Sequence, residues 1–311
     1  MIVDYIDSHR DRYGVEPICH VLSEHGIQIA PSTYYAHHSQ PVSPAALAEA
    51  YLVNELVDLH RANWGVYGAE KLWQAARRDG LDVGRDRVAR LMKIAGLVGA
   101  VRGRHRTQTT VPDRSAPRHP DLVKRAWQAP TRIDQLWVAD FSYVWTLAGF
   151  VYVAFVVDVF SRRILGWRVT VSKHTALVTD ALHQALQTRR HTVTGWTADQ
   201  LIHHSDAGSQ YVSLAFTAEL VAAGITGSIG TVGDALDNAL CESTIGLFKT
   251  EAIDLAGPAW TDRRQVEWQV ARWVHWYNLD RLHSSIGHLP PLEFETQHRQ
   301  AEPVTPIPEV A

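Results

Sequence analysis

The sequence is poor in cysteine and has no apolar run long enough to cross a membrane. Its 311 residues include two cysteines, Cys19 and Cys241, which are too few for a disulfide framework or a four-cysteine zinc site. We therefore expect a reducing, cytoplasmic location. The longest apolar run, near residues 150–157, is too short to span a bilayer. The first residues are charged and lack an apolar centre, so we expect no signal peptide and no membrane partner.

Positive charge is scarce at both ends of the sequence and concentrated between them. The formal net charge is −3, but residues 1–60 carry −6, residues 61–132 carry +10 and residues 133–311 carry −7. A basic block between two acidic ones favours a polyanion-binding module joined to a domain that uses carboxylates. A solvated basic face is the alternative, and charge alone does not separate the two.

The first hundred residues have helical periodicity. Residues 1–40 predict a helical region with a weak helix-turn-helix pattern, and residues 45–100 predict a clearer helix-turn-helix DNA-binding domain. Its last helix, Arg85–Ala95, is basic, and residues 101–130 follow as a basic linker suited to tracking phosphates. The candidate DNA-binding residues of these two segments are Arg85, Arg87, Arg90, Lys93, Arg102, Arg104 and Arg106.

Residues 131–256 change to a pattern of three consecutive strands followed by strands separated by helices. This order predicts an α/β fold with a mixed sheet and helices on its faces. The expected strands are 135–144, 149–157, 164–170, 201–204 and 225–228, and the expected helices are 173–189, 213–223 and 237–255.

Residues 257–298 predict a helical extension, and residues 299–311 a disordered tail. The extension contains a tryptophan-rich helix over 262–279, which we interpret as mostly core. Four polar or aromatic residues at its end are candidates for DNA contact or for support of the site: Tyr277, Asn278, Arg281 and His283.

Three acidic residues stand in positions that favour chemistry. Asp140 lies among apolar strand residues, Asp206 follows a short strand, and Glu242 lies early in the expected helix 237–255. Carboxylates that meet at one end of a sheet repel one another unless a divalent cation neutralises them, and oxygen ligands favour Mg²⁺ or Mn²⁺. Two such ions can clamp the attacking and leaving oxygens of a phosphoryl displacement. Asp234 and Asp237 compete with Glu242 as the third acid.

Other residues near these acids have simpler interpretations. Lys249 follows Glu242 by almost two helical turns, so it emerges on about the same face and is a candidate phosphate-binding residue; an exposed helix lysine is the alternative. His203 and His204 precede Asp206, but adjacent strand residues point to opposite faces, which argues against a zinc site. We interpret Asp158 as a turn acid rather than as part of the site.

The motifs around these acids resemble the DDE transposases of bacterial insertion sequences, within the retroviral-integrase superfamily, and more narrowly the second-frame (OrfB) product of the IS-three family. The matching stretches around the acids are WVADFSY at 137–143, HSDAGSQY at 204–211 and DNALCES at 237–243. Further stretches match at 66–73, 90–97, 157–167, 249–251 and 276–283. Two mild departures are Ala207, where the family often has a basic residue, and a loop at 230–236 that is less aromatic than expected.

The resemblance implies an RNase H-like integrase core in which Asp140, Asp206 and Glu242 are the catalytic acids and ligands of two Mg²⁺ ions, with Mn²⁺ as a substitute. It implies metal-dependent 3′-end cleavage and strand transfer on double-stranded DNA, both at the element's terminal inverted repeats and at target DNA. It also implies a homo-oligomer on DNA, an upstream-frame OrfA partner and association with the nucleoid. Two alternatives remain: an RNase H-like nuclease without strand transfer, and a non-catalytic helix-turn-helix regulator.

Overall fold

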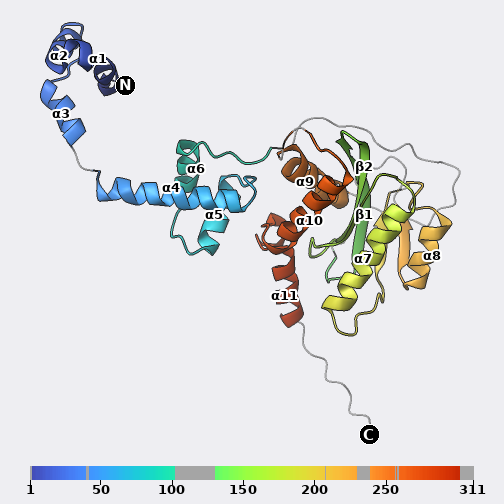
Figure 1. Cartoon of the computed structure of the whole chain (residues 1–311). Helices are drawn as coiled ribbons and strands as arrows, with labels where there is room; N and C mark the ends of the chain where they lie inside the picture. Colours follow the sequence, from blue (N-terminus) through green and yellow to red (C-terminus); the bar gives the residue numbers. More distant parts are fainter. Residues whose placement is uncertain are drawn as a thin grey trace. The chain divides into compact units, whose positions relative to one another are not determined.

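The computed structural model describes residues 2–39, 42–101, 130–206, 208–229, 239–255, 257 and 259–301 (Figure 1). The chain divides into two compact units, Met1–Asp58 and Leu59–Ala311. The basic linker with Arg102, Arg104 and Arg106, the loop that contains Asp234 and Asp237, and the tail from residue 302 lie outside the described residues. No helix in the described ranges is long and apolar enough to cross a membrane.

The first unit is helical, as its periodicity predicts. It contains α1 (Ile2–Tyr13), α2 (Val15–Glu24), α3 (Pro31–Ser39) and most of α4 (Pro44–Ala62), which continues into the second unit. α1, α2 and α3 share a small apolar core, and the Tyr34 hydroxyl, which donates to Asp7 Oδ1 at 2.6 Å, ties α3 to α1. The core residues are Ile6, Val15, Ile18, Cys19 and Tyr34.

A helix pair opens the second unit. α5 (Ala69–Arg78) and α6 (Arg85–Ile94) are joined by a short turn, across which Trp73 Nε1 donates to the Val83 carbonyl at 2.9 Å. α6 buries Val88, Leu91 and Met92 and leaves its basic residues exposed, as the sequence predicts. The pair therefore presents one basic helix face to solvent.

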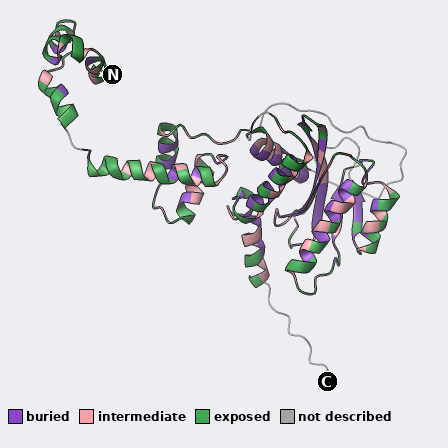
Figure 2. Ribbon diagram, viewed as in Figure 1, coloured by how far each residue is buried: buried purple, intermediate pink, exposed green. Residues whose placement is uncertain are grey.

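The centre of the second unit is a mixed five-stranded sheet in the order β3-β2-β1-β4-β5. β1, β2 and β3 form an antiparallel meander, whereas β4 and β5 run parallel to β1, and β1 and β2 are mostly buried (Figure 2). This arrangement confirms the predicted α/β fold. The strands are β1 (Leu136–Thr146), β2 (Gly149–Asp158), β3 (Ile164–Thr170), β4 (Ile202–Ser205) and β5 (Thr226–Ile229).

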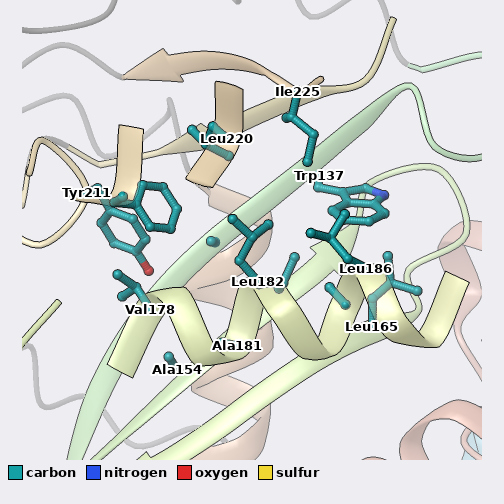
Figure 3. Packing of buried hydrophobic residues seen from close by; sticks show 14 of the residues in the cluster. Trp137, Ala154, Leu165, Val178, Ala181, Leu182, Leu186, Tyr211, Leu220 and Ile225 are labelled. Carbon is teal, nitrogen blue, oxygen red and sulfur yellow. The ribbon is translucent and has the colours of Figure 1, made fainter. Parts of the chain in front are cut away.

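Helices cover both faces of the sheet. α7 (Ala176–Thr192) packs on Trp137, Ala154 and Leu165 of three different strands, and α8 (Leu214–Ala222) adds Phe216 and Leu220 to the same cluster (Figure 3). Because strand neighbours point to opposite faces, Phe155 meets the other layer, where it contacts Phe248 of α9 (Ala239–Phe248) and Trp273 of α10 (Arg263–Leu279).

β3 and α7 approach so closely that only glycine fits at position 166. A Cβ there would lie 2.0 Å from the carbonyl oxygen of Ala181 and 2.8 Å from the amide nitrogen of Ala185. Both obstacles are backbone atoms, which no side-chain rotation can move. Gly166 therefore sets the distance between α7 and the sheet.

The expected helix 237–255 is confirmed as helical from Ala239 to Asp254, but its second half is not α-helical. α9 ends at Phe248, and the chain continues as a π-helix, η1 (Lys249–Asp254). The wider turn accompanies burial of Glu251, which pairs with buried Arg281 (Arg281 Nε to Glu251 Oε2, 2.9 Å). The spacing of apolar residues does not predict this π-helix, because the ion pair that accompanies it is made with a residue far along the sequence.

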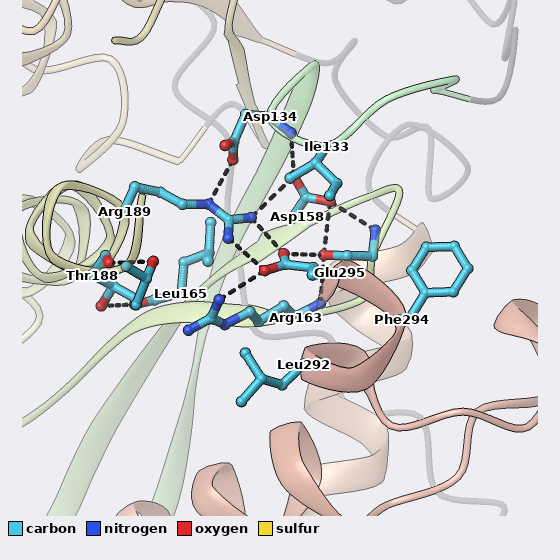
Figure 4. A network of polar contacts seen from close by, with 12 residues as sticks. Ile133, Asp134, Asp158, Arg163, Leu165, Thr188, Arg189, Leu292, Phe294 and Glu295 are labelled. Carbon is cyan, nitrogen blue, oxygen red and sulfur yellow. Dashed lines mark hydrogen bonds and ion pairs between the residues drawn. The ribbon is translucent and has the colours of Figure 1, made fainter. Parts of the chain in front are cut away.

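A buried cluster of charges joins the last helix to the sheet. The 3₁₀ turn η2 (Ser284–Ile286) leads to α11 (Pro291–Ala301), whose Glu295 is 2% exposed. Arg189 of α7 donates to both Glu295 oxygens at 2.7 and 2.6 Å and to Asp134 Oδ1 at 2.7 Å (Figure 4). Arg163 donates to Glu295 as well, at 2.7 Å. α11 lies mostly within the predicted helical extension 257–298 but runs on to Ala301, so the predicted tail from residue 299 begins too early; the sequence patterns did not predict the charge cluster.

Asp158 lies within the same buried cluster. Its Oδ1 accepts hydrogen bonds from the Ser161 amide at 2.7 Å and the Ser161 hydroxyl at 3.0 Å, which confirms its interpretation as a turn acid. Its Oδ2 accepts from the Asp134 amide at 2.8 Å. Asp158 thus holds the β2–β3 turn rather than facing a substrate.

Candidate active site

Asp140 and Asp206 lie side by side because of strand register. β1 and β4 are parallel, and their last paired residues are Ala139 and Ser205. The next residue on each strand is an aspartate, so both carboxylates emerge where the parallel ladder ends. Two carboxylates 66 positions apart in the sequence are thereby adjacent in space.

Glu242 approaches the two aspartates from the first turn of α9. α9 packs on β1 through Cys241, which is fully buried, and the charges of Asp140, Asp206 and Glu242 all act on its thiol. Burial, followed by those three charges, raises the pKa of Cys241 well above its usual value. The glutamate next to Cys241 is exposed, so its carboxylate faces solvent at the mouth of the site.

The pKa of Asp140 is shifted by burial and by the charges of the other two acids. Burial raises the pKa of Asp140 well above its usual value, and the negative charges of Asp206 and Glu242 raise it further. The Phe141 amide, which donates to Asp140 Oδ1 at 2.7 Å, and the charge of Lys249 oppose the shift. Burial also raises the pKa of Asp206, against a hydrogen bond that its Oδ1 accepts from the Gly208 amide at 3.0 Å.

The carboxylate oxygens of the three acids suit a hard divalent cation, but the side chains do not lie in a complete coordination shell. Among the described residues, no three His, Cys, Asp or Glu side chains gather tightly enough to hold a metal ion unaided. Asp140 and Asp206 each turn one oxygen to a backbone amide. The remaining carboxylate oxygens of Asp140, Asp206 and Glu242 are hard donors, and a bound cation would relieve the mutual repulsion of the three charges.

Lys249 stands at the start of η1, beside the carboxylates. Its Nζ lies 5.0 Å from the centre of the Tyr143 ring, and its charge lowers the pKa of Asp140. The sequence analysis did not identify Tyr143, because alternation along a strand places residues three apart on opposite faces and no local pattern points to it. The aromatic ring holds the ammonium group near the acids.

The two histidines before Asp206 have structural partners. His203 packs against Tyr211 and Phe216, and burial, followed by the charge of His204, lowers its pKa to about 3. His204 Nδ1 lies 2.9 Å from Ser228 Oγ on the neighbouring strand. The two rings therefore contact different elements, as alternation along the strand predicts.

The other candidate residues fall into two groups. Arg85, Arg87, Arg90 and Lys93 all lie exposed on α6. The candidate residues near the end of α10 make structural contacts. Arg281 pairs with Glu251, and Asn278 makes two hydrogen bonds of 2.9 Å with the backbone of Ile164. Tyr277 and His283 are also buried.

Family models match two parts of the chain. Integrase core domain models match residues 130–235 and 223–291, and an HTH-like domain model matches residues 46–105. A transposase for insertion sequence element IS629 of Shigella sonnei is 45% identical over 93% of this chain and 94% of its own length. The chain belongs to the insertion-sequence transposases.

The transposase is also similar to a second curated relative and, more distantly, to a solved structure. A putative transposase for insertion sequence element IS986/IS6110 of Mycobacterium tuberculosis is 46% identical over 87% of the chain and 96% of its own length. Among solved structures, the catalytic core domain of BIV integrase aligns over 54% of the chain and 98% of its own, at 20% identity and a TM-score of 0.39. The RNase H-like integrase fold of the transposase rests on its sheet topology and on the family model.

Proposed function

We propose that this transposase cuts DNA at element 3′ ends and joins them to new DNA, with Asp140, Asp206 and Glu242 as the catalytic acids. The observation that carries the proposal is the strand register that sets Asp140 beside Asp206, with the charge of Glu242 acting on the same site. Family membership supports the class of reaction.

The acids are proposed to hold two Mg²⁺ ions, for which Mn²⁺ substitutes. When bound, such ions supply Lewis-acid activation of the attacking oxygen and stabilisation of the leaving oxygen. Asp140 and Asp206 keep their remaining oxygens in fixed directions because backbone amides hold the others. Glu242, on α9 and exposed, completes the set from the solvent side.

Two displacements at phosphorus account for the reaction. In the first, a water oxygen bonds to phosphorus at the element end, the bond to the 3′ oxygen breaks, and the 3′ oxygen takes up a proton to become a hydroxyl. In the second, the oxygen of that 3′-hydroxyl bonds to the phosphorus of another phosphodiester, and the bond from that phosphorus to its own 3′ oxygen breaks. The attacking hydroxyl gives up its proton, and the departing 3′ oxygen takes one up to become a hydroxyl. Lys249, held over Tyr143, binds a non-bridging phosphate oxygen in both steps.

A strand-transfer assay with pre-cut ends separates this proposal from a nuclease that only hydrolyses. The purified transposase, incubated in Mg²⁺ with labelled duplexes that already carry a free 3′-hydroxyl, is expected to give labelled products longer than the substrate. Chelation of the divalent cation should abolish them. Hydrolytic products without any joined product would favour the plain nuclease.

The exposed basic face of α6 is proposed to bind the terminal repeats, as the match to an HTH-like domain supports. Replacement of Arg85, Arg87 and Arg90 by glutamine is expected to weaken duplex binding and flatten its salt dependence, by roughly 0.9 in log–log slope for each phosphate that the variant no longer neutralises. A gel-shift titration at several salt concentrations measures both quantities. Unchanged affinity and slope would contradict a role for α6, and Arg168→Gln, on β3, is the matched control.

The partners of the transposase on DNA are part of the same proposal. Joining requires that two element ends and a target be held together, so we propose an oligomer of at least two copies, assembled on DNA in the nucleoid. An upstream-frame OrfA protein is proposed as a further partner. Size measurement of the complex with and without end duplexes tests the oligomer directly.

A further inference from the structure

Away from the carboxylates, the second unit contains a hollow of about 420 Å³ walled by tryptophans. One wall is the end of α4 and the turn after it, and the other is α10. The residues that matter to its chemistry are Trp64, Trp268, Arg272, His275, Trp276 and Asp280. None of them belongs to the catalytic site proposed above.

Two of the indoles form a fixed platform. The rings of Trp64 and Trp276 stack with their centres 5.6 Å apart and their planes 26° from parallel. A guanidinium caps each end of the pair: Arg272 lies 5.3 Å from the Trp64 ring centre, and Arg281 lies 5.9 Å from that of Trp276. The platform is thus ordered before any ligand arrives.

The third indole, Trp268, is exposed. Its side chain is 66% accessible, and no aromatic or cationic partner stacks on it within the part of the chain that the structure describes. Arg264 and Arg272 lie one helical turn before and after it on α10, and both are exposed. A planar side chain between two guanidinium groups suits a ligand that is both flat and attached to an anionic backbone.

The hollow is lined by polar groups that can hydrogen-bond to a ligand, and an aliphatic ligand could not form these hydrogen bonds. Trp276 is 4% exposed, and its Nε1 has no hydrogen-bond partner among the described residues. His275 and Asp280 add a ring nitrogen and a carboxylate to the lining. A heteroaromatic ring with its own donors and acceptors matches this combination, and carboxylates accept from exocyclic amino groups of bases.

We infer that this hollow binds an unpaired nucleobase of DNA. The base stacks on the exposed ring of Trp268, beside the edge of the Trp64–Trp276 platform, and the adjoining phosphates contact Arg264 and Arg272. The inference rests on the proposed action on DNA, since strand cutting and joining leave unpaired ends. It adds a site for single-stranded DNA that is separate from the duplex-binding face of α6.

The test measures binding without chemistry. The full chain carrying Asp140→Asn, without divalent cations, is titrated against a labelled single-stranded oligonucleotide and against an abasic chain of equal length. The unmodified hollow is expected to prefer the oligonucleotide about tenfold, because stacking of one base is worth roughly that much. Adding Trp268→Ala should bring the ratio close to one, whereas Trp268→Phe should keep most of it.

Trp145→Ala is the matched control, since that indole is 62% exposed on β1, outside the hollow. A ratio that Trp268→Ala leaves unchanged, or that Trp145→Ala lowers equally, would overturn the inference. So would an equal affinity of the unmodified chain for both ligands. Because no cleavage is measured, failure here leaves the proposed catalytic acids untouched, and failure of strand transfer leaves this binding ratio untouched.

Discussion

Replacement of Asp140 or Asp206 by asparagine, or of Glu242 by glutamine, is expected to reduce strand cleavage and strand transfer by roughly 10³-fold or more. The amides keep the shape of the acids, and an asparagine Oδ1 can still accept the hydrogen bonds from Phe141 and Gly208. What each variant loses is the negative charge that we propose holds a divalent cation. Cleavage of a labelled end duplex in Mg²⁺, followed with time, measures the loss.

Folding of the Asp140→Asn variant should be intact, which separates loss of chemistry from loss of structure. Burial and the charges of Asp206 and Glu242 disfavour ionised Asp140, so a neutral amide removes a cost, and the melting temperature should stay equal or rise. Asp180→Asn is the control, because Asp180 is an exposed aspartate that pairs with Arg168. A triad variant that nicks end DNA as fast as the Asp180 control would refute the assignment.

The sequence identifies the three candidate acids but does not predict how they lie relative to one another. Asp140 and Asp206 stand out because a carboxylate beside apolar strand residues is unusual, and the meander followed by helix-linked strands predicts a mixed sheet. Their adjacency depends on the parallel pairing of β1 with β4 in the register Ala139–Ser205, which is a long-range contact that no local pattern encodes. Glu242 could be separated from Asp234 and Asp237 only by the spacing of the resembled family.

The structural features that the sequence did not predict depend on contacts between residues far apart along the chain. η1 replaces regular helix where Glu251 reaches Arg281, thirty residues further on. The tryptophans of α10 divide between core and surface: Trp273 is fully buried and Trp268 is exposed, although both lie on the same helix. Periodicity predicts that a helix has an inner and an outer face, but the sequence does not say which neighbours each face will meet.

The largest expected effect on stability comes from Glu295→Gln. Arg189 is completely buried, and its guanidinium donates to both oxygens of Glu295 and to Asp134. The variant removes the carboxylate that both Arg189 and Arg163 contact and leaves Arg189 with Asp134 as its hydrogen-bonded partner; loss of one partner of a buried ion pair costs about 3–5 kcal/mol. Urea unfolding at neutral pH should therefore give a much lower midpoint for the variant. Glu293→Gln on the same helix, which breaks a half-exposed pair with Arg78, should change the stability by no more than about 1 kcal/mol.

The destabilisation by Glu295→Gln should also depend on pH. Burial alone would raise the pKa of Glu295, but its hydrogen bonds and ion pairs with Arg189, and then Arg163, lower it to about 2. A carboxylate with a lowered pKa stabilises the fold above its unfolded value and loses that contribution as the pH falls through the folded value. The gap between wild type and variant should thus be largest above about pH 4.5 and shrink toward pH 2. A gap that stays constant across this range would mean that Glu295 acts through packing rather than through its charge.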